Sequence, residues 1–381
     1  MSFWIALVEP GAYILAAINR EGVVLWARCT TGRGHLLAIL LPITSVVACQ
    51  DAIAPPRQAS PAEATTAETP EIDATFTITD LGTLAGGTNS YGEAINASGD
   101  VAGISTVAGG LQHAVIWVGT TVTDLGVPFG TQSAAFGIND GQTVVGYTTD
   151  GTTKYAVLWK NGGFTLISGP TSPQSTSASA VNNNDVVTGY FLDAGTSFHA
   201  YRYSAATGLV DIHPAGFAQS VGLGINDNGV IAGYVQLANG STHAARWTSS
   251  NVFSDLGTLG GDIGQAEAVN SAGTIVGESE EASGKISAFT WRANTSMVGT
   301  GLGGYALGIS NAGRVVGYKP LPNKSVAATG KNTTTITVLP LLPLGVNSFA
   351  VGVNTCGHIA GIADIPGGAY RAVRWTIGAC D

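Results

Sequence analysis

The sequence predicts an all-β chain built from seven copies of one unit, and three observations support this. An aliphatic residue and an Asn, followed seven residues later by Gly, recur at spacings of 43, 43, 44, 44, 40 and 44 residues. Small residues stand two and four positions before each Asn, a period of two that is typical of strands. A Trp or Tyr stands 20 or 21 residues after the Asn in six copies. The seven anchor positions are Asn96, Asn139, Asn182, Asn226, Asn270, Ser310 (a degenerate copy) and Asn354.

Each copy contains four short segments that read as strands. The first ends at the anchor, and a turn of the form Asn-x-x-Gly follows, as from Asn96 to Gly99. Asn can bond its own backbone, and Gly supplies a positive φ, so both favour a short hairpin. The second strand is apolar, the third ends in the aromatic residue, and the fourth ends in Asp-Leu-Gly, as at 255–257. Four strands in 40–45 residues predict one blade of a seven-bladed β-propeller. The rival β-solenoid would have shorter coils.

The two ends of the repeat region are complementary. The last copy has little room for a fourth strand between Trp375 and Asp381, whereas residues 75–81 look like a spare fourth strand before the first copy. We therefore expect a propeller over residues 75–381 whose N-terminal strand completes the last blade and hides the free edges.

The surface composition excludes one class of partner. Charged residues make up 11% of the chain, against about 25% in average proteins, and 53 of 381 residues are Gly. The net charge is −9, and no Lys/Arg cluster occurs. A nucleic-acid partner is therefore not expected.

The N-terminal region reads as a targeting segment, residues 1–48. Two Arg residues precede an apolar stretch over 36–47 that is too short for a transmembrane helix and ends in Val-Val-Ala-Cys at 46–49. This resembles a bacterial lipoprotein signal, and the resemblance implies cleavage before Cys49 and its lipidation. The alternative is an ordinary secretion signal with a chance Cys. Charged residues and Pro interrupt residues 1–22, so we expect the true translation start near 23–25.

The predicted mature chain begins with a spacer. Residues 49–74 contain four Pro with Ala, Thr and acids, a composition typical of a disordered linker. The domain that follows keeps only Cys356 and Cys380, which in an exported protein predict a disulfide worth roughly 3–4 kcal/mol. Two free thiols are the alternative.

Several segments resemble the HAF repeat of probable extracellular bacterial proteins. The matching segments are the Asp-Leu-Gly-Thr-Leu runs at 80–84 and 255–259, the Ile-Asn-x-x-Gly at 95–99 and the His-Ala-Val-Ile-Trp at 113–117. The resemblance covers about residues 76–376. It implies an exported repeat protein, and it implies no general activity, cofactor or catalytic residue.

Repeated polar residues read as structural. His113, His199 and His243 begin third strands of different blades, so we expect them to lie apart rather than to form a metal site. The Asp residues of the Asp-Leu-Gly segments are expected to cap turns. The Asn-rich loops at 182–185 and 226–229 faintly resemble calcium loops but lack the bidentate Glu. No metal and no cofactor are predicted. These repeated Asp residues are Asp80, Asp124, Asp211 and Asp255.

A functional site is therefore sought among residues that differ between copies. Glu93 and Glu267 are the acids on predicted innermost strands, and Glu278, Glu280 and Glu281 form an acidic loop in the fifth copy. The leading hypothesis is a lipid-anchored binding scaffold at the cell envelope, with an envelope protein or glycan as partner and membrane contact only through the lipid. Two alternatives are an extracellular polysaccharide hydrolase or lyase using Glu93 and Glu267, and a purely structural or adhesive protein. Residues expected at the axial opening are Tyr91, Glu93, Phe136, Leu223, Glu267, Tyr305 and Phe349.

Overall fold

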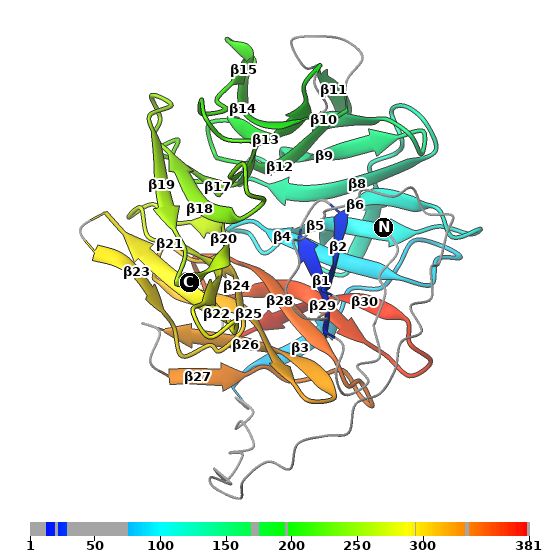
Figure 1. Ribbon diagram of the computed structural model, residues 1–381. Coiled ribbons are helices and arrows are strands. Elements are labelled where there is room, and N and C mark those ends of the chain that lie inside the picture. The colour runs from blue at the N-terminus through cyan, green and yellow to red at the C-terminus, as the bar shows by residue number, and fades with distance from the viewer. Residues whose placement is uncertain are drawn as a thin grey trace, which may run out of the picture. The chain divides into compact units, whose positions relative to one another are not determined.

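The computed structural model describes residues 13–19, 22–28, 75–168, 175–194, 197–293, 295–331 and 335–378 (Figure 1). The chain divides into two units, residues 1–71 and 72–381. In the first, β1 (Tyr13–Asn19) and β2 (Gly22–Arg28) pair antiparallel. These strands lie within the predicted targeting segment, whose role stays a prediction, while Cys49 and the predicted linker lie outside the described residues. Within the described part of the chain, no helix is long and apolar enough to cross a membrane.

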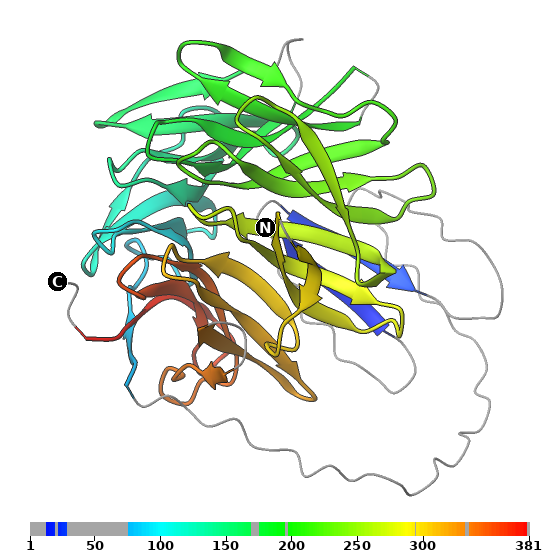
Figure 2. The ribbon, with the colours of Figure 1, turned by 90° about the vertical axis from the view of Figure 1, so that its left-hand side faces the viewer.

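The second unit is a seven-bladed β-propeller, as predicted: seven antiparallel sheets of four strands follow one another around an axis (Figures 1 and 2). The first strands of neighbouring blades contact one another. Blade 1 contains β4 (Ser90–Ile95), β5 (Val101–Thr106), β6 (Gln112–Val118) and β7 (Thr121–Asp124). Blade 2 contains β8 (Gln132–Ile138), β9 (Val144–Thr149), β10 (Lys154–Lys160) and β11 (Gly163–Ile167). Blade 3 contains β12 (Thr176–Val181), β13 (Val187–Leu192), β14 (Phe198–Ser204) and β15 (Gly208–Asp211).

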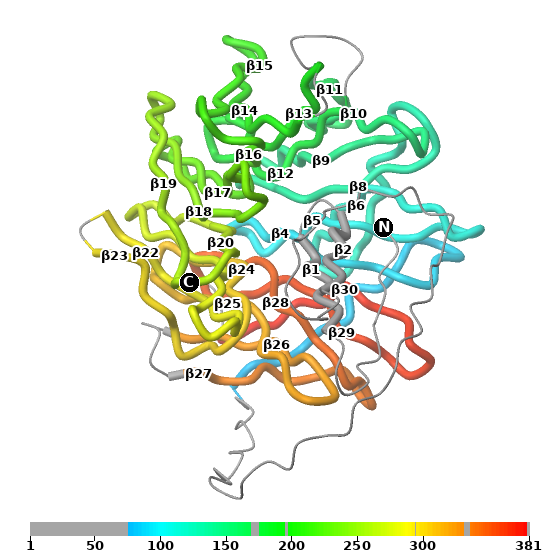
Figure 3. The backbone as a smooth tube through the Cα atoms, in the orientation of Figure 1, coloured from blue at the N-terminus to red at the C-terminus, as the bar shows by residue number. Residues whose placement is uncertain are grey.

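The remaining blades repeat this order, which the tube in Figure 3 traces strand by strand. Blade 4 contains β16 (Gln219–Ile225), β17 (Ile231–Gln236), β18 (Thr242–Trp247) and β19 (Phe253–Gly257). Blade 5 contains β20 (Gly260–Val269), β21 (Ile275–Glu281), β22 (Ile286–Arg292) and β23 (Thr295–Gly299). Blade 6 contains β24 (Tyr305–Ile309), β25 (Arg314–Leu321), β26 (Lys324–Lys331) and β27 (Thr335–Val338). Blade 7 contains β28 (Ser348–Val353), β29 (Ile359–Asp364), β30 (Tyr370–Thr376) and β3 (Thr77–Asp80).

Blade 7 closes the ring as predicted, because its outer strand comes from the start of the domain. Strand β3 pairs antiparallel with β30, so that Thr77 lies opposite Thr376 and Asp80 opposite Val373. In Figure 1 the blue β3 therefore lies beside the red strands. The pairing covers the outer edge of β30 with a strand from the other end of the domain.

The small residues of the first strands allow neighbouring blades to approach closely. A Cβ atom on Gly92 would lie 2.8 Å from the carbonyl oxygen of Gly361, and one on Gly224 would lie 2.7 Å from that of Glu267. Between the two small positions every first strand contains a β-bulge, which the sequence pattern does not predict. The residues skipped in the register are Glu93, Phe136, Ser179, Leu223, Glu267, Leu307 and Val351.

The hydrophobic core lies between blades. One cluster joins Leu81, Val101 and Trp117 to Ala360 and Ala372, and so connects blade 1 with blade 7. The repeated third-strand aromatics are central to this core, since Trp117, Trp247 and Trp375 are fully buried.

Candidate functional site

The seven anchor turns converge on an axial pocket with a volume of about 170 Å³. Each blade contributes the same positions: the aliphatic residue before the anchor, the anchor itself, or the residue after it. The anchors are buried, whereas the residues that follow them are exposed. We call these exposed residues the rim; they are Ala97, Asp140, Asn183, Asp227, Ser271, Asn311 and Thr355.

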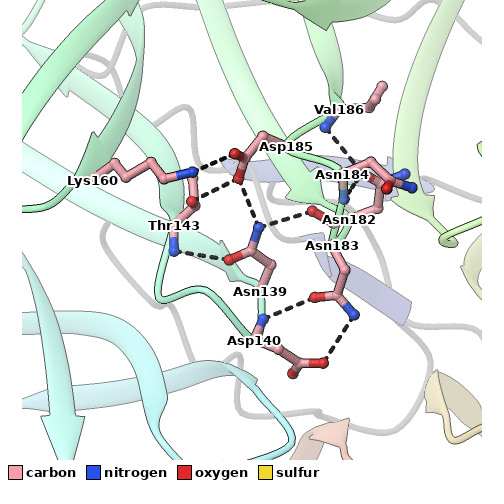
Figure 4. Close-up of polar contacts among 9 residues, drawn as sticks. All are labelled: Asn139, Asp140, Thr143, Lys160, Asn182, Asn183, Asn184, Asp185 and Val186. Carbon is pink, nitrogen blue, oxygen red and sulfur yellow. Dashed lines mark hydrogen bonds and ion pairs between the residues drawn. The ribbon is translucent and has the colours of Figure 1, made fainter.

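The anchor Asn residues link the blades in a ring. The Nδ2 of Asn139 donates to the carbonyl oxygen of Asn182 at 2.9 Å, and its Oδ1 accepts the main-chain N–H of Thr143 at 2.9 Å (Figure 4). One side chain thus fixes its own turn and bonds the next blade. The turn role is predicted from the sequence, but the bond between blades is not. The inter-blade bonds are Asn96 to Asn139 (3.4 Å), Asn139 to Asn182 (2.9 Å), Asn182 to Asn226 (2.9 Å), Asn226 to Asn270 (2.8 Å), Asn270 to Ser310 (3.2 Å) and Asn354 to Asn96 (3.1 Å).

Ser310 interrupts this ring between blades 6 and 7. Its hydroxyl accepts the main-chain N–H of Arg314 at 3.1 Å, so it keeps the turn role of the anchor. A Ser has no second polar atom for the next blade, and the described residues show no side-chain bond from Ser310 to Asn354. The degenerate copy therefore keeps one of the two functions of the Asn.

The rim forms a second chain of hydrogen bonds. In this chain, the Oδ1 atom of a rim side chain accepts a main-chain N–H of the preceding blade. Asp140 accepts from Ala97 at 2.8 Å, and Asp227 accepts from Asn183 at 2.9 Å. The Nδ2 of Asn183 also donates to Asp140 (2.9 Å) and to Asp227 (3.1 Å), so the amide holds two carboxylates in place (Figure 4 shows the Asp140 side). The rim is consequently preorganised, with acceptor oxygens held at the pocket mouth.

The loop at 182–185 is occupied by protein contacts. Asp185 accepts hydrogen bonds from Asn139 (2.9 Å) and Thr143 (2.7 Å) and pairs with Lys160, all from blade 2 (Figure 4). Burial alone would raise the pKa of Asp185, but the bonds from Lys160, Thr143 and Asn139 outweigh it and lower the pKa. Its carboxylate links two blades, which leaves little support for the calcium-loop interpretation.

The repeated His and Asp residues form pairs within single blades. His113 Nδ1 lies 2.8 Å from Asp124 Oδ2, and the other oxygen of Asp124 accepts the N–H of Gly126 at 2.8 Å. The turn-capping prediction for Asp is confirmed. The described residues hold no group of three or more His, Cys, Asp or Glu suited to a metal ion. The corresponding pairs are His199–Asp211 (2.9 Å), His243–Asp255 (2.9 Å) and, with Arg in place of His, Arg371–Asp80 (3.7 Å).

Glu93 and Glu267 do not form an open catalytic pair. They occupy the bulges of blades 1 and 5, which are not neighbours, and are only 6% and 2% exposed. Neither lines the axial pocket. Glu93 lies near Tyr91, whose pKa rises to about 12 through burial, the nearby Tyr370 and the charge of Glu93.

Glu267 instead belongs to what we call the blade 5–6 cluster: Gln265, Glu267, Glu278, Tyr305 and Tyr318. Burial and the adjacent charge of Glu267 raise the pKa of Glu278 well above its ordinary value. Burial and then Glu278 raise the pKa of Tyr305 to about 12. The rings of Tyr305 and Tyr318 stack with centroids 4.5 Å apart and 11° between planes.

The sequence pattern groups Glu278 with the acidic loop of Glu280 and Glu281, whereas the structure buries it within β21. One signal could have found it. In blades 2, 3, 4 and 6 the residue directly after the second-strand Gly is a Tyr, and in blade 5 it is Glu278. Because the other blades place an aromatic ring at this position, a Glu there indicates a buried carboxyl.

Comparison with known proteins identifies the fold. No family model and no curated protein matches the sequence. A catalytically inactive virginiamycin B lyase from Staphylococcus aureus, in complex with quinupristin, superposes with a TM-score of 0.51 at 10% identity, over 80% of this chain and 100% of that one. TolB from Acinetobacter baumannii gives a TM-score of 0.48 at 10% identity, over 74% and 67% of the two chains. The BP39L lectin from Burkholderia pseudomallei gives 0.40 at 10% identity, over 75% and 98%. At such identities the similarity concerns the fold alone.

Proposed function

We propose that this protein is an exported, lipid-anchored binding propeller of the bacterial cell envelope, and that the axial pocket receives part of an envelope glycan or protein. The observation that carries this proposal is the rim: exposed polar groups from six blades surround one pocket, and neighbouring blades fix several of them. Preorganised groups bind with less loss of conformational freedom than mobile ones.

The rim favours a small, hydroxyl-rich group. Its carboxylate and amide oxygens accept hydrogen bonds, its amides and hydroxyls donate them, and none of the described residues that line the pocket is Lys or Arg. The volume of about 170 Å³ is below the roughly 300–1,000 Å³ of pockets for drug-sized ligands. A single sugar unit, or the tip of a larger partner, matches this size better than a whole cofactor.

The chemistry of the cysteines supports export. Cys356 is disulfide-bonded, and disulfides persist mainly in oxidising compartments. The predicted partner, Cys380, lies outside the described residues, so the pairing stays a prediction. The lipobox ending at Cys49 and the low charge content agree with an envelope location.

The binding proposal is tested on a glycan array and by calorimetry with fragments of the envelope polysaccharide. Asn183→Ala removes the amide that holds Asp140 and Asp227, and we expect at least a tenfold loss of affinity. Asn239→Ala, in the loop between β17 and β18, is the matched exposed control and should bind normally. Equal binding by both variants, or no glycan or envelope-protein binding by the wild type, would contradict the proposal.

Export and anchoring are tested separately. Cells producing the wild-type chain are labelled with a fatty acid and fractionated, and we expect label on the mature protein in the membrane fraction. Cys49→Ser should abolish the label and release the protein. Label that persists in this variant would exclude Cys49 as the lipidation site.

A further inference from the structure

The blade 5–6 cluster sets two side chains face to face on neighbouring strands. Gln265 on β20 and Glu278 on β21 are direct cross-strand partners. Such partners point to the same face of the sheet with Cβ atoms about 4.5–5.5 Å apart. Glu267, two residues along β20, is close enough to act on the pKa of Glu278. Two carboxyls and one amide therefore gather at the boundary with blade 6.

Two oxygens of this cluster lack a hydrogen bond. Within the described part of the chain, Glu278 Oε2 and Gln265 Oε1 are buried atoms without a partner. Glu278 is only 7% exposed, whereas Gln265 is half-buried. Buried acceptors are normally satisfied, because an unmade hydrogen bond there is costly. The pair thus presents two buried acceptors on neighbouring strands that lack a donor among the described residues.

Aromatic rings lie near Glu278, since its charge adds to burial in raising the pKa values of Tyr305 and Tyr318. Tyr318 stacks on Tyr305, and Phe349 meets Tyr318 edge-on with centroids 5.0 Å apart. All three rings are half-buried, so the wall formed by blades 6 and 7 is partly open to solvent. Aromatic faces attract a cation within about 6 Å of the ring centroid.

We propose that the blade 5–6 cluster binds a primary ammonium group, carried by an amine ligand or by a lysine side chain of a partner. An ammonium offers three N–H donors, enough to satisfy Glu278 Oε2 and Gln265 Oε1 together. Its charge compensates the carboxyls, and the rings supply the apolar wall. A calcium ion fits less well, since it takes six to eight oxygen ligands and the described cluster offers two carboxyls and one amide oxygen.

Binding of the ammonium is linked to protons. Burial and Glu267 raise the pKa of Glu278, so the empty cluster retains a proton on this carboxyl to a higher pH than an exposed Glu would. The ammonium requires the carboxylate, and its binding therefore releases that proton. The other titratable groups facing Glu278 are Glu267, Tyr305 and Tyr318; both tyrosines have raised pKa values and stay neutral during the test. Affinity should accordingly increase with pH.

The test is calorimetric titration of the full-length chain with methylammonium chloride, against sodium chloride of equal ionic strength. Two buffers with different heats of ionisation report the released proton. We expect specific binding that tightens as the pH is raised from 5 to 8, and at least a tenfold loss in Glu278→Gln. Circular dichroism checks that this variant folds. Glu280→Gln, on the same strand, is the matched control and should bind as the wild type does.

Several results would overturn the proposal: no heat beyond that of sodium chloride, equal binding of tetramethylammonium (which has no N–H donor), preferential binding of calcium, or unchanged binding in Glu278→Gln. The site is separate from the axial pocket. Asn183→Ala should leave methylammonium binding intact, so that failure here and failure of the rim proposal are distinguishable.

Discussion

The ring of anchor turns and the blade 5–6 cluster both bury polar groups between blades, but they differ in whether those groups are hydrogen-bonded. In the ring, Asn182 has both ends of its amide bonded: Nδ2 to Asn226, and Oδ1 to main-chain N–H groups of its own turn. In the cluster, Glu278 keeps a buried oxygen without a bond among the described residues. The repeated feature is satisfied, and the feature found in one copy is not. Of these two regions, the one that the repeat does not explain is therefore the better candidate for a ligand site.

The largest expected effect comes from breaking the ring. Asn226→Ala would leave the N–H of Val230 and the carbonyl of Asn270 without their side-chain partner. The unsatisfied N–H of Val230 costs about 1–3 kcal/mol, whereas the carbonyl of Asn270 still accepts the N–H of Gly273 and loses one bond worth about 0.5–1.5 kcal/mol. We therefore expect unfolding in denaturant to show a loss of about 2–4 kcal/mol. Asn228→Ala removes one exposed bond, to Ser271, in the same turn and should cost below about 1 kcal/mol. Equal losses of unfolding free energy in the two variants would mean that the inter-blade bonds of the anchors stabilise the fold no more than an exposed hydrogen bond does.

An intermediate effect is expected from neutralising the cluster. The raised pKa of Glu278 means that the folded protein binds this proton more tightly than the unfolded chain. The carboxyl therefore contributes full stability below the unfolded pKa of about 4.3, and this contribution is lost as the pH rises through the folded pKa. We expect Glu278→Gln to stabilise the protein by about 1–2 kcal/mol near pH 8, as replacement of a buried charge commonly does.

Measuring the stability of the wild type and of Glu278→Gln at several pH values distinguishes the removal of a buried charge from improved packing. The advantage of Glu278→Gln should shrink as the pH falls toward about 4, because the wild-type carboxyl is then protonated in the folded state and largely protonated in the unfolded chain. A stabilisation that is independent of pH would contradict a buried charge, and a destabilisation at pH 8 would mean that the carboxylate has a partner that the amide cannot replace.

The smallest effect comes from repairing the ring. Ser310→Asn supplies the missing donor toward Asn354 while keeping an oxygen for the N–H of Arg314. One added hydrogen bond should stabilise the fold by about 0.5–1.5 kcal/mol in the same denaturation experiment. Ser310→Ala, which removes the existing turn bond, is the opposite control and should destabilise. If Ser310→Asn is neutral, the blades 6 and 7 are not spaced for the bond.

The sequence predicts the features that repeat and misses those that depend on contacts between copies. Seven blades, the strand β3 that closes blade 7 and the capping role of Asp124 follow from local patterns and from the two ends of the domain. The bond from Asn139 to Asn182 joins residues 43 positions apart, and nothing in one copy reveals it. The pattern also misses the bulge at Glu267, which arises from the pairing register of β20 and β21 within one blade. This bulge buries a residue that the period of two alone would place at the axial opening.

The most direct test that the blade 5–6 cluster, unlike the ring, holds an unsatisfied polar group is a carbon NMR titration of the Glu278 carboxyl. Its signal is assigned by comparison with Glu278→Gln. We predict a titration midpoint well above that of an ordinary Glu and a shift of this midpoint to lower pH on saturation with methylammonium. A Glu278 carboxyl that titrates at its ordinary value, or that does not respond to methylammonium, would contradict an unsatisfied acidic site between blades 5 and 6.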